Sequence, residues 1–123
     1  MACSIRSPQD VCQNFEWTAD GDYTAWTMYK VNDTVCVNKA AASSGDECVM
    51  YYEIPKVVVP CITITSGNQS SFDEGSKVYF DSTASKVTNV ASGNTLCGIV
   101  TTKPAVGATT VEIHLMGALG ITS

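Results

Sequence analysis

An excess of β-branched residues over leucine is the feature of this sequence that most constrains its fold. The 123 residues include 14 Val, 7 Ile and 14 Thr but only 3 Leu. Because β-branched side chains lose rotamer freedom in helices and fit the pleated surface of a sheet, this ratio favours strands. Short apolar runs separated by turn-forming residues strengthen that prediction. We expect an all-β fold, a single compact β-barrel or β-sandwich (β-tulip-like) domain of short antiparallel strands.

Clusters of Ser, Gly, Asn and Asp separate the candidate strands and supply the turn chemistry between them. Apolar and polar residues alternate along Thr110–Met116, which predicts one dry face and one wet face. Val57–Val59 lacks this alternation and predicts a strand buried on both faces, with Pro60 at a bulge or an edge. The candidate strands are Thr24–Val31, Thr34–Asn38, Glu47–Ile54, Val57–Thr65, Lys77–Phe80, Lys86–Val90, Thr95–Thr102 and Thr110–Met116.

The N-terminal 28 residues differ in character from the rest of the chain. Phe15, Trp17, Tyr23 and Trp26 stand among polar residues without the periodicity of a core strand. We therefore predict an extended N-terminal arm over residues 1–28, followed by a β-rich domain over residues 29–123. Two roles remain open for the four aromatic residues. They form an interface with a partner or a neighbouring copy, where such side chains are enriched, or they cap one end of the β domain.

The charge and hydropathy of the chain argue against two classes of partner. Seven basic residues stand against twelve acidic ones, a net charge of -5, so the sequence offers no basic face for nucleic acid. The longest apolar stretch, Val57–Ile64, is far shorter than the roughly 20 residues that span a bilayer as a helix. The first ten residues carry no apolar segment typical of a signal peptide, which favours synthesis in the cytoplasm.

The six cysteines follow no metal-binding spacing, because no C-x-x-C pair occurs and the chain has a single histidine. Cys3 and Cys12 lie in a polar stretch and are the pair we would examine for oxidation after the protein leaves a reducing cell. The other four lie in apolar runs and are expected to be small buried hydrophobes: Cys36, Cys48, Cys61 and Cys97.

The sequence predicts no catalytic residue, no cofactor site and no metal site. His114 has no nucleophile motif beside it, and neither glycine-rich phosphate-binding pattern occurs. The carboxylate pairs Asp20/Asp22 and Asp73/Glu74 are candidates for acid–base chemistry, but their glycine-rich polar surroundings are typical of solvated turns. We therefore expect a protein that is not an enzyme, and keep a small carboxylate hydrolase only as a third hypothesis.

The C-terminal two thirds of the chain resemble a known family. In the DUF2190 family of small phage capsid decoration proteins, a G-x-x-V-Y-W-D strand precedes a K-V-T strand, a G-N-T-x-x-G turn and a last alternating strand. Phe80 stands at the position of the family's Trp, and Cys97 stands where an apolar residue is usual. Weaker similarity extends back to roughly residue 29. The segments that carry the resemblance are Glu74–Asp81, Lys86–Asn89, Ser92–Val100 and Gly107–Gly117, with Ala40–Val49 and Glu53–Lys56 in weaker form.

This resemblance implies a structural virion protein, a capsid decoration or cement protein. Such a protein binds the outer capsid surface of the assembled head in many copies and stabilises it against the pressure of packaged DNA. Its partner is the major capsid protein, it needs no cofactor, and the resemblance implies a homo-oligomer, a trimer. A second reading is a head fibre or spike base that displays a host- or glycan-binding surface, for which the Ser-rich loop at residues 66–71 is available.

Overall fold

The computed structural model describes residues 3–5 and 12–117. Parts of the predicted arm (residues 1–2 and 6–11) and the end of the predicted β domain (residues 118–123) lie outside the described residues. The fold is all-β, as predicted, with one short 3-10 helix, η2 (Gln69–Phe72). The strands are β1 (Ser4–Ile5), β2 (Gln13–Thr18), β3 (Met28–Val31), β4 (Thr34–Asn38), β5 (Glu47–Pro60), β6 (Lys77–Asp81), β7 (Lys86–Thr88), β8 (Thr95–Thr102) and β9 (Thr110–Met116).

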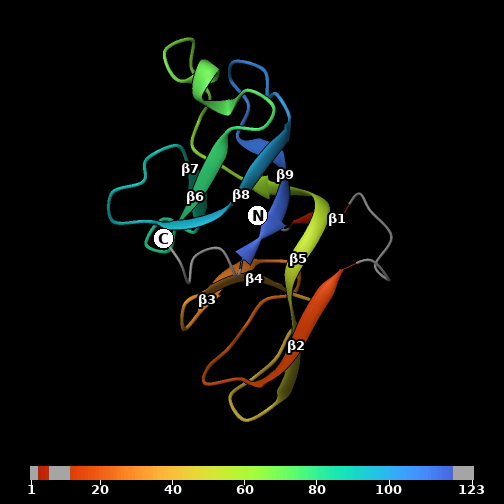
Figure 1. The fold of residues 1–123 in the computed structure, drawn as a ribbon. Coiled ribbons are helices and arrows are strands. Elements are labelled where there is room, and N and C mark those ends of the chain that lie inside the picture. Colours follow the sequence, from red (N-terminus) through yellow and green to blue (C-terminus); the bar gives the residue numbers. More distant parts are fainter. Residues whose placement is uncertain (1–2, 6–11, 118–123) are drawn as a thin grey trace.

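One long strand, β5, extends from the end of the molecule that carries β2 into its centre (Figure 1). The sequence predicts two strands here, Glu47–Ile54 and Val57–Thr65, but the structure joins them into one strand that ends at Pro60. A register shift between Ile54 and Val57 marks a bulge at this junction. The bulge accommodates Pro55, which has no N–H to donate to a neighbouring strand. Pro60 occupies the strand's last position, an end rather than the expected bulge or edge.

The second half of β5 belongs to a barrel-like lobe, which we call the barrel lobe (residues 54–117). Its strands follow the order β5-β9-β8-β6-β7, and every neighbouring pair is antiparallel. A parallel bridge between Cys61 and Val87, with the Ile62 amide donating to the Val87 carbonyl at 2.9 Å, brings the chain after β5 back to β7. The sheet is therefore almost closed, which protects its polar main-chain edges.

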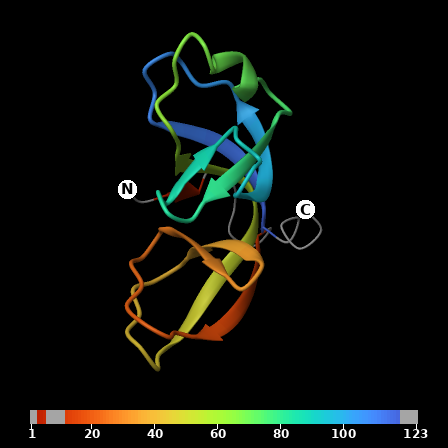
Figure 2. The ribbon, with the colours of Figure 1, turned by 90° about the vertical axis from the view of Figure 1, so that its left-hand side faces the viewer.

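The first half of β5 belongs to a second, smaller lobe, which we call the aromatic lobe (residues 13–53; Figure 2). Its strand order is β2-β5-β4-β3. A tight turn connects β3 to β4, with Asn32 at a φ of 53°. Asn adopts this left-handed conformation more readily than most residues, and Asn-Asp suits such a hairpin turn. The predicted strand Thr24–Val31 begins only at Met28, because the chain turns at Trp26, whose φ is also 53°.

The described part of the N-terminal segment is integrated into the sheet. β2 pairs with β5 in antiparallel register over residues 13–18, from Gln13 opposite Glu53 to Thr18 opposite Glu47. β1 pairs with β5 farther along, with Ser4 opposite Val58. The segment that the sequence assigns to an arm therefore contributes two strands to the same side of β5.

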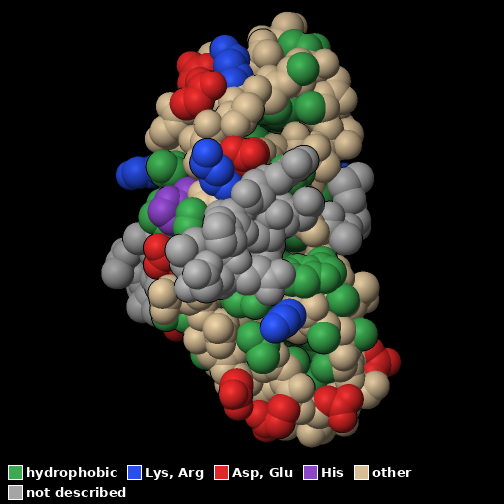
Figure 3. Space-filling view, turned by 90° about the vertical axis from the view of Figure 1, so that its right-hand side faces the viewer, with side chains coloured by type: hydrophobic (Ala, Val, Ile, Leu, Met, Phe, Trp, Pro, Cys, Tyr) green, Lys and Arg blue, Asp and Glu red, His purple; other side chains and the backbone are tan. Residues whose placement is uncertain are grey.

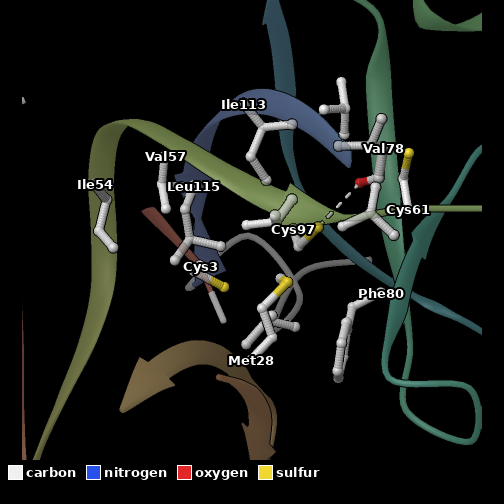
Figure 4. Close-up of a cluster of buried hydrophobic side chains, with 14 of the residues drawn as sticks. Cys3, Met28, Ile54, Val57, Cys61, Val78, Phe80, Cys97, Ile113 and Leu115 are labelled. Atoms are coloured by element: carbon white, nitrogen blue, oxygen red, sulfur yellow. Dashed lines mark hydrogen bonds between the residues drawn. The ribbon is translucent and has the colours of Figure 1, made fainter. Parts of the chain in front are cut away.

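A main cluster of twenty buried residues fills the barrel lobe and extends under the inner face of the aromatic lobe. The predicted alternation along β9 is confirmed, because Val111, Ile113 and Leu115 are buried while the residues between them are half-buried. Val57 and Val59 are buried, but Val58 is only half-buried, so the strand is not buried equally on both faces. Figure 4 shows side chains from both lobes converging on this cluster, including Met28 from β3.

Two glycines allow the close strand approaches on which this packing depends. A Cβ atom at Gly98 in β8 would collide with the main-chain carbonyl of His114 in β9. A Cβ atom at Gly117, directly after β9, would collide with the carbonyl oxygen of Val35 in β4. The end of the barrel lobe's last strand is thus in main-chain contact with the aromatic lobe, which joins the two lobes into one domain.

Candidate interaction surface

The outer face of the aromatic lobe carries a second, smaller cluster of side chains. Six residues form its buried part, contributed by β3, β4, β5 and the loops beside them. Five aromatic side chains, each half-buried, surround them, and we call this set the aromatic face. The buried residues are Ala19, Val31, Cys36, Ala42, Cys48 and Met50, and the aromatic face consists of Phe15, Trp17, Tyr23, Tyr29 and Tyr52.

Ring contacts fix the aromatic face in two groups. The ring of Tyr23 lies between those of Trp17 and Tyr29, with centroid distances of 5.1 and 4.6 Å and edge-to-face geometry in both pairs. The ring of Phe15 lies 6.0 Å from that of Tyr52 on the neighbouring strand. Edge-to-face pairs stabilise their arrangement beyond the area they bury. The face therefore presents a preformed apolar surface that remains partly exposed.

Two tyrosines of the aromatic face form hydrogen bonds through their hydroxyl groups. The Tyr23 hydroxyl donates to Asp20 Oδ1 at 2.6 Å, and the Tyr29 hydroxyl accepts from the Thr24 amide at 2.7 Å. The hydrogen bond to the Asp20 carboxylate is the main cause that raises the pKa of Tyr23 to about 12. These hydrogen bonds hold both hydroxyls within the lobe, so the face presents chiefly the apolar parts of these two rings.

The structure brings together three of the four aromatic residues singled out in the sequence. Phe15, Trp17 and Tyr23 belong to the aromatic face, but Trp26 packs against the main cluster and stacks on Tyr51 with 6.3 Å between centroids. Trp26 keeps its positive φ because its amide donates to the Asn38 carbonyl at 2.7 Å and its own carbonyl accepts from the Cys3 amide. Trp26 therefore contributes to the core and not to the aromatic face.

Sequence reasoning missed the other two members of the face, Tyr29 and Tyr52. Both lie on strands that were predicted as parts of the β domain. The available signal was their spacing, because Tyr29 is two residues before Val31 and Tyr52 two residues after Met50. Residues at that spacing share one face of a strand. The pairing of β2 with β5 then places Tyr52 beside Phe15, and Tyr29 on β3 contacts Tyr23.

The aromatic lobe also carries the whole net charge of the protein. Residues 13–53 contain seven acidic and two basic side chains, a net charge of -5, which equals that of the full chain. Residues 54–117 contain four of each sign and are neutral. Figure 3, which views the side of the molecule where β2 lies, shows acidic side chains gathered at the far end of this lobe. A partner of this surface meets apolar rings and negative charge together.

Three of the four carboxylates considered for acid–base chemistry are engaged in local structure. Asp20 accepts the Tyr23 hydroxyl described above, and Asp22 is exposed in the same turn. Asp73 forms an ion pair with Lys103 at 2.9 Å, and Glu74 Oε2 accepts from the Lys103 amide at 3.2 Å. Within residues 3–5 and 12–117, no group of three or more His, Cys, Asp or Glu side chains is placed to hold a metal ion.

A pocket of about 320 Å³ opens in the barrel lobe between β5, β9 and the loop after β8. The two charged side chains at its rim, Glu112 and Lys103, already have partners within the protein. Glu112 Oε1 accepts hydrogen bonds from the hydroxyls of Thr101 and Thr102 at 2.8 and 3.0 Å, and Lys103 is paired with Asp73. The pocket therefore lacks converging polar groups that would select a small molecule.

All six cysteines are buried, including Cys3 and Cys12, which the sequence placed in a polar stretch. Burial raises the pKa of the Cys3, Cys36 and Cys97 thiols to about 12 and that of Cys61 to about 11. Because the thiolate is the reactive form, these residues behave as the small buried hydrophobes expected for the cysteines of the strands. Cys97 Sγ lies 3.5 Å from the Val78 carbonyl oxygen (Figure 4).

Among the described residues, no helix is long and apolar enough to cross a membrane. Neither the curated proteins nor the solved structures include a significant match to this chain. A family model described as phage cement protein matches residues 8–115. The match covers nearly the full length of both lobes, including β2 and the aromatic face.

Proposed function

Because the chain belongs to the phage cement protein family, whose role is decoration of the phage capsid, we propose that it binds the outer surface of the assembled head in many copies and stabilises it. The family match is the observation that carries this proposal. A ligand that binds the assembled shell and not its separated subunits shifts the equilibrium towards the assembled state. Many copies, each contacting neighbouring subunits of the major capsid protein, would multiply a modest contact.

We assign the shell contact to the aromatic lobe. Its half-buried rings are of the type that forms the energetic centre of protein interfaces, and Phe15, Trp17 and Tyr23 are held in place by neighbouring rings and by Asp20. A preformed surface binds with a smaller loss of conformational entropy than a flexible one. The barrel lobe, with its almost closed sheet and neutral charge, then serves as the rigid support.

The oligomeric state is part of the same proposal. We expect a homotrimer on the capsid surface, which the resemblance to decoration proteins implies. Analytical ultracentrifugation of the free protein checks this point, because the molar mass it measures for a trimer is three times the 13.0 kDa of the chain. A monomer in solution that reaches the shell singly would overturn the trimer while leaving the capsid contact intact.

Co-sedimentation with assembled, decoration-free shells of the cognate phage tests the function directly. We expect saturable binding at a copy number related to the shell's symmetry and an increase in the temperature at which shells break. Binding at only a few vertices without stabilisation would support the head fibre or spike reading instead. A protein that does not sediment with the shells would contradict the proposed function.

A pair of aromatic substitutions tests the assignment to the aromatic lobe. Trp17→Ala should weaken shell binding by roughly a hundredfold, the effect of losing an interface hot spot of about 2 to 3 kcal/mol. Tyr79→Ala is the matched control, because Tyr79 is a half-buried aromatic residue of β6 in the barrel lobe. Equal effects of the two substitutions would place the contact elsewhere.

A further inference from the structure

Among the described residues, the outer edge of β2 is an unpaired strand edge. β2 pairs with β5 through one edge only, and no described strand pairs with the other. Natural proteins protect such edges with lysine, proline, bulges or short strands. The edge strand β3 is four residues long and carries Lys30, and the edge strand β7 is three residues long and begins at Lys86. β2 has six residues, with neither lysine nor proline.

Two hydrogen bonds establish which main-chain groups of β2 point outwards. The Ala19 amide donates to the Asp46 carbonyl at 2.8 Å, so odd-numbered residues of this strand direct their N–H and C=O groups towards β5. The Lys39 amide donates to the Val49 carbonyl at 3.0 Å, so Val49 is directed towards β4 and away from Glu16, its partner in register. Both observations turn the N–H and C=O groups of Asn14, Glu16 and Thr18 towards the open edge.

The negative charge around this edge favours a partner segment that carries positive charge. The Glu16 side chain is exposed on β2 itself, and Asp46 and Glu47 are exposed at the end where β2 pairs with the start of β5. A second copy of the same strand would bring a second set of acidic side chains to this edge, which is electrostatically unfavourable. A strand that carries Lys or Arg would find its main-chain hydrogen bonds and opposite charges at the same edge.

We propose that the outer edge of β2 accepts an extended, basic segment of the shell protein as an added strand of the sheet. This inference rests on the proposed function and specifies how the contact is made. Main-chain hydrogen bonds to Asn14, Glu16 and Thr18 supply affinity, as in other cases of strand addition. On one face of the added strand, side chains lie beside Phe15 and Trp17 and cover rings that are now half-exposed. On the other face, its basic side chains lie near Glu16.

A proline substitution at each of two edges tests the proposal with decoration-free shells. Glu16→Pro removes an outward N–H of β2, and Lys30→Pro removes an outward N–H of β3. On β3, the Asn38 amide donates to the Thr27 carbonyl, so odd-numbered residues direct their main-chain groups towards β4 and Lys30 directs its own outwards. Proline is tolerated at such edge positions because the lost N–H has no hydrogen-bond partner within residues 3–5 and 12–117. We expect Glu16→Pro to weaken shell binding roughly tenfold or more and Lys30→Pro to leave it unchanged.

The outcomes separate this inference from the function on which it rests. If the unaltered protein binds shells and Glu16→Pro binds equally well, the strand-addition inference is wrong and the cement function stands. An equal loss for both proline variants would also overturn it, since the contact would then not be specific to β2. If the unaltered protein does not bind shells, the proposed function itself fails. Cooperative thermal melting of each variant establishes that it is folded.

A charge substitution keeps the test available if the proline variant does not fold. Glu16→Lys retains the main chain and reverses the charge at the exposed centre of β2. We expect it to weaken shell binding more than the neutral Glu16→Gln, with a difference that shrinks as salt rises. Equal binding of the two variants at low salt would show that the added segment is not basic and would overturn the proposal.

Discussion

The two lobes of this protein are built from the same kind of antiparallel sheet but differ in closure, buried core and charge. The barrel lobe closes its sheet almost completely, buries most of the main cluster of twenty residues and carries no net charge. The aromatic lobe has open edges, a second cluster of only six buried residues and the entire net charge of -5. This difference supports our proposal that the aromatic lobe carries the shell contact, and we expect the barrel lobe to supply most of the stability. A single strand, β5, belongs to both and fixes their relative position.

The largest expected contrast between the lobes comes from removing one phenylalanine ring from each. Phe72 is fully buried in the main cluster, so Phe72→Ala should lower the free energy of unfolding by about 4 kcal/mol. Phe15 is half-buried, so Phe15→Ala should cost about 1 kcal/mol. Urea denaturation followed by tryptophan fluorescence measures both. Equal losses would remove the distinction between a stabilising lobe and a recognition lobe.

Alkaline pH probes one buried thiol in each lobe. Burial raises the pKa of Cys36, in the aromatic lobe, and of Cys97, in the barrel lobe, to about 12. The unfolded chain releases these protons near pH 9 while the folded chain retains them, so the free energy of unfolding falls as pH rises above 9. Between pH 8 and 10 the two thiols together should account for a loss of about 3 kcal/mol.

Alanine variants divide that loss between the lobes. Cys36→Ala and Cys97→Ala should each reduce the difference in unfolding free energy between pH 8 and 10 by about 1.5 kcal/mol, half of that loss. This equality holds only if both lobes unfold in one transition. If Cys97→Ala reduces the pH dependence and Cys36→Ala does not, the aromatic lobe unfolds separately.

A pair of glycine substitutions gives a smaller effect. A Cβ atom at Gly98 meets the main chain of β9, so Gly98→Ala should destabilise the protein by about 2 kcal/mol. Gly21, in a turn of the aromatic lobe, has no atom within 4 Å of the added Cβ, so Gly21→Ala should change stability by less than about 0.5 kcal/mol. Thermal denaturation of the two variants compares them. A large effect at Gly21 would contradict the tolerance expected of the aromatic lobe.

The smallest expected effect is confined to the aromatic face. Tyr23→Phe removes the hydroxyl that donates to Asp20 and should cost about 0.5 kcal/mol at pH 7, because this hydrogen bond is exposed. The pKa of Tyr23 is raised to about 12, so the contribution of this bond is present below pH 10 and is lost as pH rises towards 12. Spectrophotometric titration should show one fewer tyrosine with a raised pKa in the variant.

Local patterns in the sequence were sufficient to predict the bounds of three strands, one in the aromatic lobe and two in the barrel lobe. The bounds of β4, β8 and β9 agree with the predicted strands, because the apolar residues and the turns that delimit them are neighbours in the chain. The continuity of β5 was not predictable from the same patterns. Pro55 and Lys56 interrupt the apolar run, and only pairing with the adjacent strand β9, which lies far along the chain, allows the strand to continue through a bulge.

The strand structure of the N-terminal segment could not be predicted from its own residues. Phe15 and Trp17 alternate with polar residues over a short span, but the partner that makes this span a strand is β5, about 30 positions farther along the chain. The separation of Trp26 from the other aromatic residues depends on its positive φ, which the residue type disfavours. Composition identified residues suited to an interface, and tertiary pairing decided which of them share a surface.

The placement of all net charge in one lobe gives the molecule a strong electric dipole along its long axis. Such a dipole experiences a torque in the field of any positively charged surface, so the molecule is turned before contact with the aromatic lobe leading. The effect extends over about 8 to 10 Å at physiological ionic strength and fades as salt shortens that range. The same asymmetry keeps the acidic ends of free molecules apart, which opposes their association through β2 in the absence of a shell.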